Sequence, residues 1–339
     1  MPKVINIPGW QSWSPISSSP FRHPSYLYSP HRQDIWKIAV SKSQTRSPIA
    51  GWCSWYALGR NINEKKILDN ASFFATRIKT ALPAYILIDD GWCKWGDWTR
   101  PYPHKFPSGM QKTAQKIKKA GLNPGIWLAP LLTDAPTLHR LRTFPFKFIL
   151  DLENPKIFNR ALDSIKTIVE KWRFSMLKLD FLYALHFLPR YKDSAVPNEL
   201  LRSFLSAVKK LYPHIHLNVC GCPLGPAVGI ADSMRTSADI VNPYLDHIWP
   251  INKIFHSQRL NQLETSLNFR LSSASIWLLD PDAFVCRQSL GLSPSQIFKL
   301  QSLIKKANGV YFLGDDLTRL NELQIQTYIQ PLFLDIAVS

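Results

Sequence analysis

Short hydrophobic runs recur along the chain, and four of them end in aspartate. These runs cover residues 85–88, 176–179, 276–279 and 310–314, and they precede Asp89, Asp180, Asp280 and Asp315. Runs of this length that are rich in β-branched and aromatic residues are typical of strands buried on both faces. Because an ionised carboxylate is unfavourable in such an interior, each aspartate marks the end of a strand. Parallel strands would bring these ends to one rim, where several carboxylates converge.

Segments with helical periodicity alternate with the hydrophobic runs. Between residues 63 and 79, for example, Ile67, Ala71 and Phe74 share one helix face. Residues that typically cap or end helices mark the boundaries of these segments: Asn63, Gly121, Asn154 with Pro155, Ser293 with Pro294, and Gly309. The pattern predicts strands over 51–56, 84–90, 124–129, 175–181, 215–220, 233–237, 275–280 and 310–314, and helices over 63–79, 108–120, 154–172, 197–211, 257–273 and 294–308.

The order of these elements predicts an α/β fold, a (β/α)8 TIM barrel over residues 51–339 that ends in a short tail over 317–339. Residues 1–50 are rich in serine and proline and lack helical periodicity, so we expect a short irregular or β-type N-terminal segment there. A doubly wound sheet is the alternative for the same alternation of strands and helices. It has less support because no glycine-rich phosphate loop follows the first predicted strand.

Composition narrows the class of protein. Of the 339 residues, 45% are hydrophobic, which supports a sizeable core. No run of 18 or more apolar residues is present, so we expect no membrane partner. The five cysteines show no framework spacing, and the first ten residues lack the apolar region of a signal peptide. These features predict a reduced, cytoplasmic protein.

The formal net charge of +17 raises the question of a polyanionic partner. The basic residues are dispersed rather than gathered in a stripe or an arm, so we expect a charged surface that favours solubility, and no nucleic-acid partner. The twelve tryptophans are more informative. Several of them, including Trp92, Trp95 and Trp98, lie beside Gly or Asp in loop-like sequence, which predicts flat aromatic platforms for a ligand.

Two pairs of oppositely charged residues lie at the ends of predicted strands. Lys178 and Asp180 point to the same side of a strand, and a lysine beside a carboxylate favours its ionised form, as a nucleophile requires. The alternative is that Asp180 caps the next helix and Lys178 is its ion-pair partner. Arg235 is followed four positions later by Asp239. The arginine could bind a substrate hydroxyl and hold Asp239 in place, or the two could form an ordinary surface ion pair.

Asp89 and Asp90 are adjacent carboxylates with Trp92 close behind them. Paired carboxylates accept the hydrogen bonds of vicinal sugar hydroxyls, and an indole can lie against the apolar face of a sugar. Divalent metal binding is the rival interpretation, but the usual loop pattern of oxygen ligands is absent. The residues therefore favour a sugar site over a metal site.

A second possible metal pattern combines Cys220 and Cys222 with His214 and His216. A Cys-x-Cys pair on a strand beside His-x-His is a weak zinc signal, and core cysteines with ordinary histidines explain it better. We therefore expect no metal ion in this protein.

The motifs of the predicted strands and loops follow one another in a characteristic order. They are Gly-Trp-Cys-Ser-Trp-Tyr at 51–56, Leu-Ile-Asp-Asp-Gly-Trp at 87–92, Gly-Asp-Trp at 96–98, Lys-Phe-Pro-Ser-Gly-Met at 105–110, Gly-Ile-Trp-Leu-Ala-Pro at 125–130, Lys-Leu-Asp at 178–180, Arg-Thr-Ser-Ala-Asp at 235–239 and Asp-Pro-Asp at 280–282. This ordered set resembles the α-galactosidases of glycoside hydrolase clan D, especially the melibiase-like enzymes of family 36. Residues 9–14 also resemble a loop of the β-sandwich that precedes the barrel in that family.

The resemblance implies roles for individual residues. Asp180 matches the nucleophile of a Lys-x-Asp motif, and Asp239 matches the general acid/base of an Arg-x-x-x-Asp motif. Other positions match residues that bind substrate in the family: Asp89, Asp90, Lys178, Arg235 and Cys220 as polar contacts, Trp55 and Trp127 as aromatic walls, and Trp13 as a lid aromatic from the N-terminal segment. The chemistry needs neither a metal nor an organic cofactor.

The activity that this resemblance implies is retaining hydrolysis of terminal α-galactosides by double displacement, with the two catalytic carboxyl groups about 5–5.5 Å apart. Residues 1–50 are then the remnant of a β-sandwich, and residues 51–339 form the catalytic barrel. The expected partner is a galactoside or oligosaccharide substrate. A homo-oligomer could cover the open site, or a partner chain could supply the missing domain. Two alternatives remain: galactosyl transfer, as in raffinose- or stachyose-synthase relatives, and a non-catalytic sugar-binding remnant.

Overall fold

The computed structural model describes residues 46–135, 143–144, 147–188, 190–191, 195–242 and 251–334, without the side chains of 143–144 and 251–255. Almost all of the expected N-terminal segment, including Trp13, lies outside these residues. The first described strand begins at Ile49, two positions before its predicted start at 51.

Within the described residues, one parallel sheet contains nine strand segments in the order β10–β9–β8–β7–β3–β2–β1–β12–β11. Their bounds are β1 (Ile49–Cys53), β2 (Ala84–Ile88), β3 (Asn123–Leu128), β7 (Met176–Leu179), β8 (His216–Val219), β9 (Ser233–Arg235), β10 (Leu278–Asp280), β11 (Ala283–Phe284) and β12 (Val310–Leu313). All eight predicted strands are therefore present, and the seventh, predicted over 275–280, is interrupted after Asp280 and resumes beyond its predicted end as β11.

This division closes the barrel. Only Pro281 and Asp282 separate β10 from β11 in the sequence, yet the two segments stand at opposite ends of the strand order. Because β10 pairs with β9 and β11 pairs with β12, one interrupted strand joins the two edges of the sheet. Gly309 lies so close to β10 that an added Cβ would come 2.3 Å from the carbonyl oxygen of Leu279. The predicted α/β barrel is confirmed, and the doubly wound alternative is wrong.

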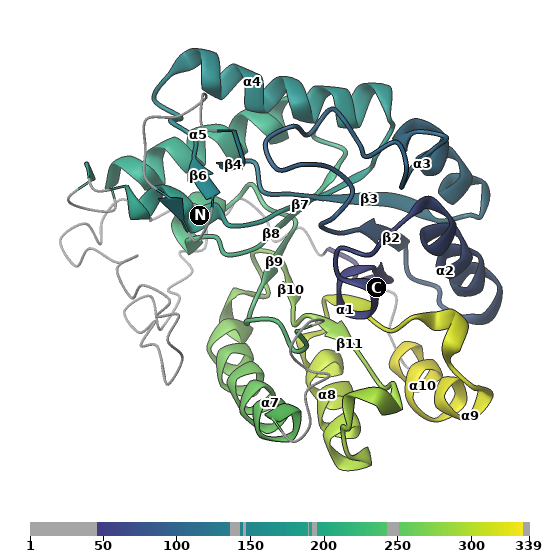
Figure 1. Ribbon diagram of the computed structural model, residues 1–339. Coiled ribbons are helices and arrows are strands. Elements are labelled where there is room, and N and C mark those ends of the chain that lie inside the picture. The colour runs from purple at the N-terminus through teal and green to yellow at the C-terminus, as the bar shows by residue number, and fades with distance from the viewer. Residues whose placement is uncertain are drawn as a thin grey trace.

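The helices form a layer around the strands, as Figure 1 shows. They are α2 (Glu64–Arg77), α3 (Met110–Lys119), α4 (Pro155–Lys166) continued by η3 (Thr167–Lys171), α5 (Ala195–Leu211), α7 (Ile251–Arg270) continued by η5 (Leu271–Ser273), and α8 (Pro294–Ala307). Shorter helical turns lie in the connections: α1 (Trp55–Leu58), η4 (Leu182–Phe187), α6 (Leu224–Ala227) and η6 (Gln288–Leu290).

The capping residues identified in the sequence act as predicted. The side chain of Asn63 accepts a hydrogen bond from the amide of Lys66 at the start of α2. Ser293 forms a reciprocal capping box with Gln296 at the start of α8. Gly121, just beyond α3, has a φ of +79°, a conformation that glycine adopts without strain.

The core lies between the strands and the inner faces of the helices. Every residue of β1, β7 and β12 is buried, as expected for a barrel whose strands are covered on both faces. On α2, Ile67 and Phe74 are 0% and 1% exposed, which confirms the helix face predicted from their spacing. Burying each such side chain contributes about 1.5–3 kcal/mol to stability.

Two parts of the fold differ from the prediction. The connection after β3 contains a small antiparallel sheet of β4 (Leu132–Thr133), β6 (Lys147–Ile149) and β5 (Thr143–Phe144), whose strands are too short to produce a periodic signal. The tail after β12 is largely helical, with η7 (Leu317–Arg319), α9 (Glu322–Gln324), η8 (Ile325–Ile329) and α10 (Gln330–Phe333). The ring of Phe333 packs edge-on against Phe74, so this tail covers α2.

The three loop tryptophans that were expected to form aromatic platforms are buried. Trp92, Trp95 and Trp98 are 0%, 9% and 4% exposed, so they do not stand on an exposed loop, and their contact with a ligand stays a prediction. Their rings pack on one another, with the Trp92 and Trp98 centroids 5.9 Å apart. The neighbouring glycines and aspartates made this sequence look like an exposed loop, although the loop folds inward over the end of the barrel.

Among the described helices, none combines the length and apolarity that a membrane-spanning segment requires.

Candidate active site

Polar side chains gather at the carboxyl end of the barrel. Asp89 and Asp90 follow β2, Asp180 follows β7, Arg235 ends β9 and Asp280 ends β10. Because all the strand pairs of the barrel are parallel, these positions lie on one rim, as the sequence predicted.

Asp89 is held by three neighbours. Its Oδ2 atom lies 2.8 Å from Nζ of Lys178 and accepts a hydrogen bond of 3.3 Å from the thiol of Cys53, and its backbone amide donates to Oγ of Ser54. Burial alone would lower the pKa of Lys178, but the charge of Asp89 and the nearby thiols of Cys53 and Cys220 raise it well above its usual value. Lys178 is therefore a positive charge held in place by Asp89 at the carboxyl end of β7.

Asp90 has a different set of partners. Its Oδ1 atom accepts a hydrogen bond of 2.7 Å from Nε1 of Trp95, and its Oδ2 atom lies 3.2 Å from Nε of Arg60. Burial raises the pKa of Asp90, although the charge of Arg60 opposes this effect. The two adjacent carboxylates thus stand on the rim in separate environments. Their role as ligands of sugar hydroxyls stays a prediction.

Asp180 is half-buried at the end of β7. Its Oδ2 atom accepts a hydrogen bond of 3.0 Å from Nε1 of Trp127, and its Oδ1 atom accepts one of 2.6 Å from the amide of Phe181. Phe181 has a φ of +54°, an uncommon value for a residue with a side chain, and precedes the turn η4. Lys178 forms its described ion pair with Asp89, so the expected pairing of Lys178 with Asp180 is wrong.

The Arg235–Asp239 pair is not a surface ion pair. The side chain of Arg235 is only 3% exposed, whereas that of Asp239 is 48% exposed, and Nη2 of Arg235 lies 2.9 Å from Oδ1 of Asp239. β9 ends at Arg235, so the loop that follows, rather than a continued strand, brings Asp239 back to the guanidinium. Arg235 also lies 2.8 Å from Asp282 and donates to the hydroxyl of Tyr56 at 3.2 Å.

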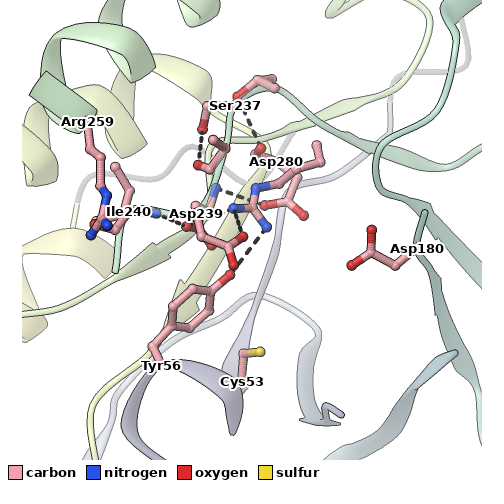
Figure 2. A network of polar contacts seen from close by, with 12 residues as sticks. Cys53, Tyr56, Asp180, Ser237, Asp239, Ile240, Arg259 and Asp280 are labelled. Atoms are coloured by element: carbon pink, nitrogen blue, oxygen red, sulfur yellow. Dashed lines mark hydrogen bonds and ion pairs between the residues drawn. The ribbon is translucent and has the colours of Figure 1, made fainter. Parts of the chain in front are cut away.

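Asp180 follows β7 and Asp239 follows β9, the two strands that flank β8. The strands β7, β8 and β9 are adjacent in the barrel, and Cys220 follows β8 between the two aspartates. Burial raises the pKa of Cys220, and the charges of Asp180 and Asp239 both raise it further. The pKa of Tyr183 is raised by burial first and then by the charges of Asp180, Cys220 and Asp239. Figure 2 shows Asp180 on its own strand beside the network that contains Asp239.

The aromatic residues of the predicted site occupy different positions. Trp127, at the end of β3, is only 3% exposed and stacks at a tilt on Trp95, with the ring centroids 5.2 Å apart. Trp55 begins α1, is half-buried and packs against the core. The third aromatic, Trp13, lies outside the described residues. The predicted function of these side chains as walls and lid of a sugar site stays a prediction.

Two residues that the sequence analysis did not include in the site contact it directly. Tyr56 was placed at the end of a predicted strand, but it lies in α1 and its hydroxyl reaches Arg235. Asp282 was noted only as part of the Asp-Pro-Asp motif at 280–282. The only hint in the sequence was that Asp282 is a second aspartate beyond a predicted strand end. Because the strand is interrupted at Pro281, the Asp282 side chain lies inside, against Arg235.

Within the described residues, no group of three or more His, Cys, Asp or Glu side chains is placed to hold a metal ion. Nε2 of His216 shares a hydrogen bond of 2.8 Å with Oγ of Ser233, and burial lowers the pKa of His216 to about 4. Cys222 is close to the carbonyl oxygen of Pro223. His216 and Cys222 therefore form hydrogen bonds within the fold, whereas His214 is exposed.

The chain has measurable similarity to known α-galactosidases. It is 36% identical to a probable α-galactosidase B of Aspergillus fumigatus over 104 residues, which are 28% of this chain and 24% of that protein. Its structure is similar to that of an α-galactosidase from Thermus thermophilus in complex with p-nitrophenyl α-D-galactopyranoside, with a TM-score of 0.70, 25% identity and coverage of 86% of this chain and 62% of that chain. No protein-family model matches the chain.

A family 36 α-galactosidase from Geobacillus stearothermophilus shares the fold, with a TM-score of 0.61 at 17% identity over 85% of this chain and 41% of that chain. In each of the three comparisons, the matched region spans less than two thirds of the other protein. The similarity is nevertheless consistent in sequence and in structure. In sequence this chain resembles α-galactosidases, and in structure it shares the fold of α-galactosidases that include a family 36 enzyme.

Proposed function

We propose that this protein is a retaining α-galactosidase that hydrolyses terminal α-linked galactosides by double displacement. The observation that supports this most is the position of Asp180 after β7 and of Asp239, held by the buried Arg235, after β9 at the carboxyl rim of the barrel. Two aspartates in different environments at this rim are what a double displacement requires. The similarity to α-galactosidases supports galactose as the sugar that is transferred.

In this proposal, Asp180 is the nucleophile. Both of its oxygens accept hydrogen bonds, from Trp127 and from the amide of Phe181, and these fix the orientation of the carboxylate. Asp180 attacks the anomeric carbon and forms a covalent bond to the galactosyl group as the bond to the leaving oxygen breaks. A fixed orientation favours this step because the attacking oxygen must lie in line with the breaking bond.

Asp239 is the general acid/base. In the first step it transfers its proton to the leaving oxygen, and in the second it removes a proton from the water that releases the sugar. The exposed side chain of Asp239 suits this exchange with solvent, while the buried Arg235 holds it at the rim. The two inversions at the anomeric carbon together retain its configuration.

The sugar-binding part of the site is built around Asp89, Asp90 and Lys178. These side chains are buried and held by neighbours, so their positions are set before a sugar arrives. A preorganised set of charged donors and acceptors is suited to several sugar hydroxyls at once. Cys220 and Trp127 complete the proposed pocket.

Hydrolysis of p-nitrophenyl α-D-galactopyranoside tests the proposal. The wild-type chain is expected to release nitrophenol, and NMR of the first sugar product is expected to show the α-anomer. Asp180→Asn should abolish turnover while thermal unfolding changes little. Asp69→Asn is a matched control, because this aspartate is 44% exposed on α2 and its described ion pair is with Lys65, four positions earlier.

Other outcomes identify the alternatives. Binding of galactose without any release of nitrophenol would show a sugar-binding remnant, and product partitioning that depends on an added sugar acceptor would show a transferase. Substantial activity in the Asp180→Asn variant would contradict the assignment of the nucleophile. A β-configured first product would contradict retention.

A further inference from the structure

One guanidinium nitrogen is shared between two carboxylates. Nη2 of Arg235 lies 2.9 Å from Oδ1 of Asp239 and 2.8 Å from Oδ2 of Asp282. The side chain of Asp239 is 48% exposed, but that of Asp282 is only 1% exposed. Asp282 is therefore out of reach of a substrate and can act only through the groups that it contacts.

Asp282 also holds the backbone beside Asp239. The same Oδ2 atom that pairs with Arg235 accepts a hydrogen bond of 2.6 Å from the amide of Ile240, the residue after Asp239. Figure 2 shows Asp239 and Ile240 in this network, and Tyr56 next to Asp239. A single carboxylate thus fixes both the guanidinium that contacts Asp239 and the chain segment that carries it.

The position of Asp282 is itself enforced. Its φ of +84° lies in a region that residues with side chains rarely adopt, and such strain is often found at functional sites. Its amide donates a hydrogen bond of 3.0 Å to Oδ1 of Asp280, whose Oδ2 accepts one of 2.8 Å from Asn218. The backbone carbonyl oxygen of Asp280 also accepts a hydrogen bond from the amide of Thr236. Contacts from two neighbouring strands therefore keep the strained turn in place.

The charges in this cluster are unequal, because two carboxylates face one guanidinium. Burial raises the pKa of Asp282 to about 7, the charge of Arg235 opposes this rise, and the charge of Asp239 adds to it. Tyr56, from α1, is the remaining titratable group that contacts Asp282. Nη1 of Arg259, from α7, donates a hydrogen bond of 3.4 Å to the carbonyl oxygen of Ile240. Asp239 and Asp282 therefore compete for the positive charge of one guanidinium.

We propose that Asp282 is a positioning residue for Asp239. It holds Arg235 and the Ile240 amide so that the Asp239 carboxyl stays directed into the site, and it competes with Asp239 for the single positive charge. This inference rests on the proposed function, since it needs Asp239 to be the acid.

The test compares Asp282→Asn with the wild type on two α-galactosides that differ in their leaving groups. A nitrophenyl leaving group departs with little help from an acid, whereas a sugar or methanol requires a proton. We expect kcat/KM for methyl α-galactoside to fall about 10–100-fold more than kcat/KM for the nitrophenyl substrate. We also expect the basic limb of the kcat/KM profile to move to lower pH, because Arg235 then stabilises ionised Asp239 alone.

Asp315→Asn is the matched control. Asp315 is also a buried rim carboxylate with an arginine partner, since its side chain is 2% exposed and lies 2.8 Å from Nη1 of Arg287. This control should lose stability without changing the ratio of the two substrates or the basic limb. If Asp282→Asn does not fold, Asp282→Glu, which keeps the charge but displaces it by one methylene, should show the same difference between substrates.

The remaining outcomes contradict either the positioning role of Asp282 alone or that role together with the proposed function. An equal loss on both substrates with an unmoved basic limb would show that Asp282 has only a structural role, and the proposed function would stand. If the loss in kcat/KM on methyl α-galactoside relative to the nitrophenyl substrate were the same in the Asp282 and Asp315 variants, Asp282 would likewise have only a structural role. A wild-type chain that releases no nitrophenol would overturn the proposed function and this inference together.

Discussion

Nζ of Lys178 lies 2.8 Å from Oδ2 of Asp89, and the two side chains are only 6% and 4% exposed. Lys178 is on β7 and Asp89 follows β2, so the pair reaches across β3, which lies between these strands in the barrel. Such an ion pair connects the part of the rim that carries the proposed nucleophile with the part that carries the proposed sugar ligands.

Removing one partner of this pair should be costly. Lys178→Met leaves Asp89 as an uncompensated buried charge, and we expect the free energy of unfolding to fall by about 3–5 kcal/mol. Lys65→Met is the control, because Lys65 is 82% exposed and its pair with Asp69 should contribute about 0.5 kcal/mol or less. Urea unfolding at neutral pH measures both, and equal losses would contradict the prediction.

The indole of Trp127 should matter for the chemical step rather than for folding. Trp127→Phe removes the hydrogen bond of 3.0 Å to Asp180 but keeps an aromatic ring in the core. A hydrogen bond to a charged group contributes about 1.5–3 kcal/mol, so kcat should fall about 10–100-fold. Trp172→Phe is the control, since Trp172 is half-buried and packs edge-on against Trp92. A similar fall in kcat for both variants would refute a specific role for Trp127.

Asp282 should make stability depend on pH in an unusual direction. Its pKa is raised by burial to about 7, so the folded protein binds a proton that the unfolded chain releases near pH 4. The stabilising contribution of this proton is complete below about pH 4 and is lost as the pH rises through about 7. The stability advantage of the wild type over Asp282→Asn should therefore shrink between pH 5 and pH 8 in thermal unfolding. An advantage that grows over this range would contradict the direction of the shift.

The first strand depends on a glycine. A Cβ atom at Gly51 would lie 2.3 Å from the carbonyl oxygen of Tyr85 and 2.6 Å from the ring of Phe312, so Gly51→Ala must separate β1 from its neighbours. We expect this variant to lose more than about 3 kcal/mol of stability or to be insoluble. Gly125→Ala, on β3, meets only side-chain atoms at 3.4 Å and should change stability by about 1 kcal/mol or less. The yield of soluble protein and its unfolding midpoint measure the difference.

Local signals in the sequence predicted much of this fold. Asn63, Asn154 and Ser293 cap helices through contacts within three residues, so the sequence alone contains both partners. The strand ends could be predicted equally well, because an aspartate after an apolar run marks where the buried segment ends. The positions of Asp89 and Asp180 on one rim followed from these signals and from the parallel order of the strands.

The contacts that depend on the closed barrel could not be predicted in this way. The partner of Lys178 is 89 positions away in the sequence, and only the strand order selects Asp89 over the nearer Asp180. Similarly, Arg235 meets Asp282 because the seventh strand divides at Pro281, and no periodic pattern reports that division. The small sheet after β3 was missed because strands of two or three residues give no periodicity.

The divided strand that closes the barrel has a consequence for the order of events during folding. Asp282 lies in the turn between β10 and β11, so the contact that supports Arg235 requires β10 to be paired with β9. The proposed nucleophile and sugar ligands belong to strands made earlier on the ribosome, but the proposed acid takes its support from a strand that is made late. Recovery of glycosidase turnover during refolding would therefore report the formation of this turn, and signals that follow the formation of helices would not.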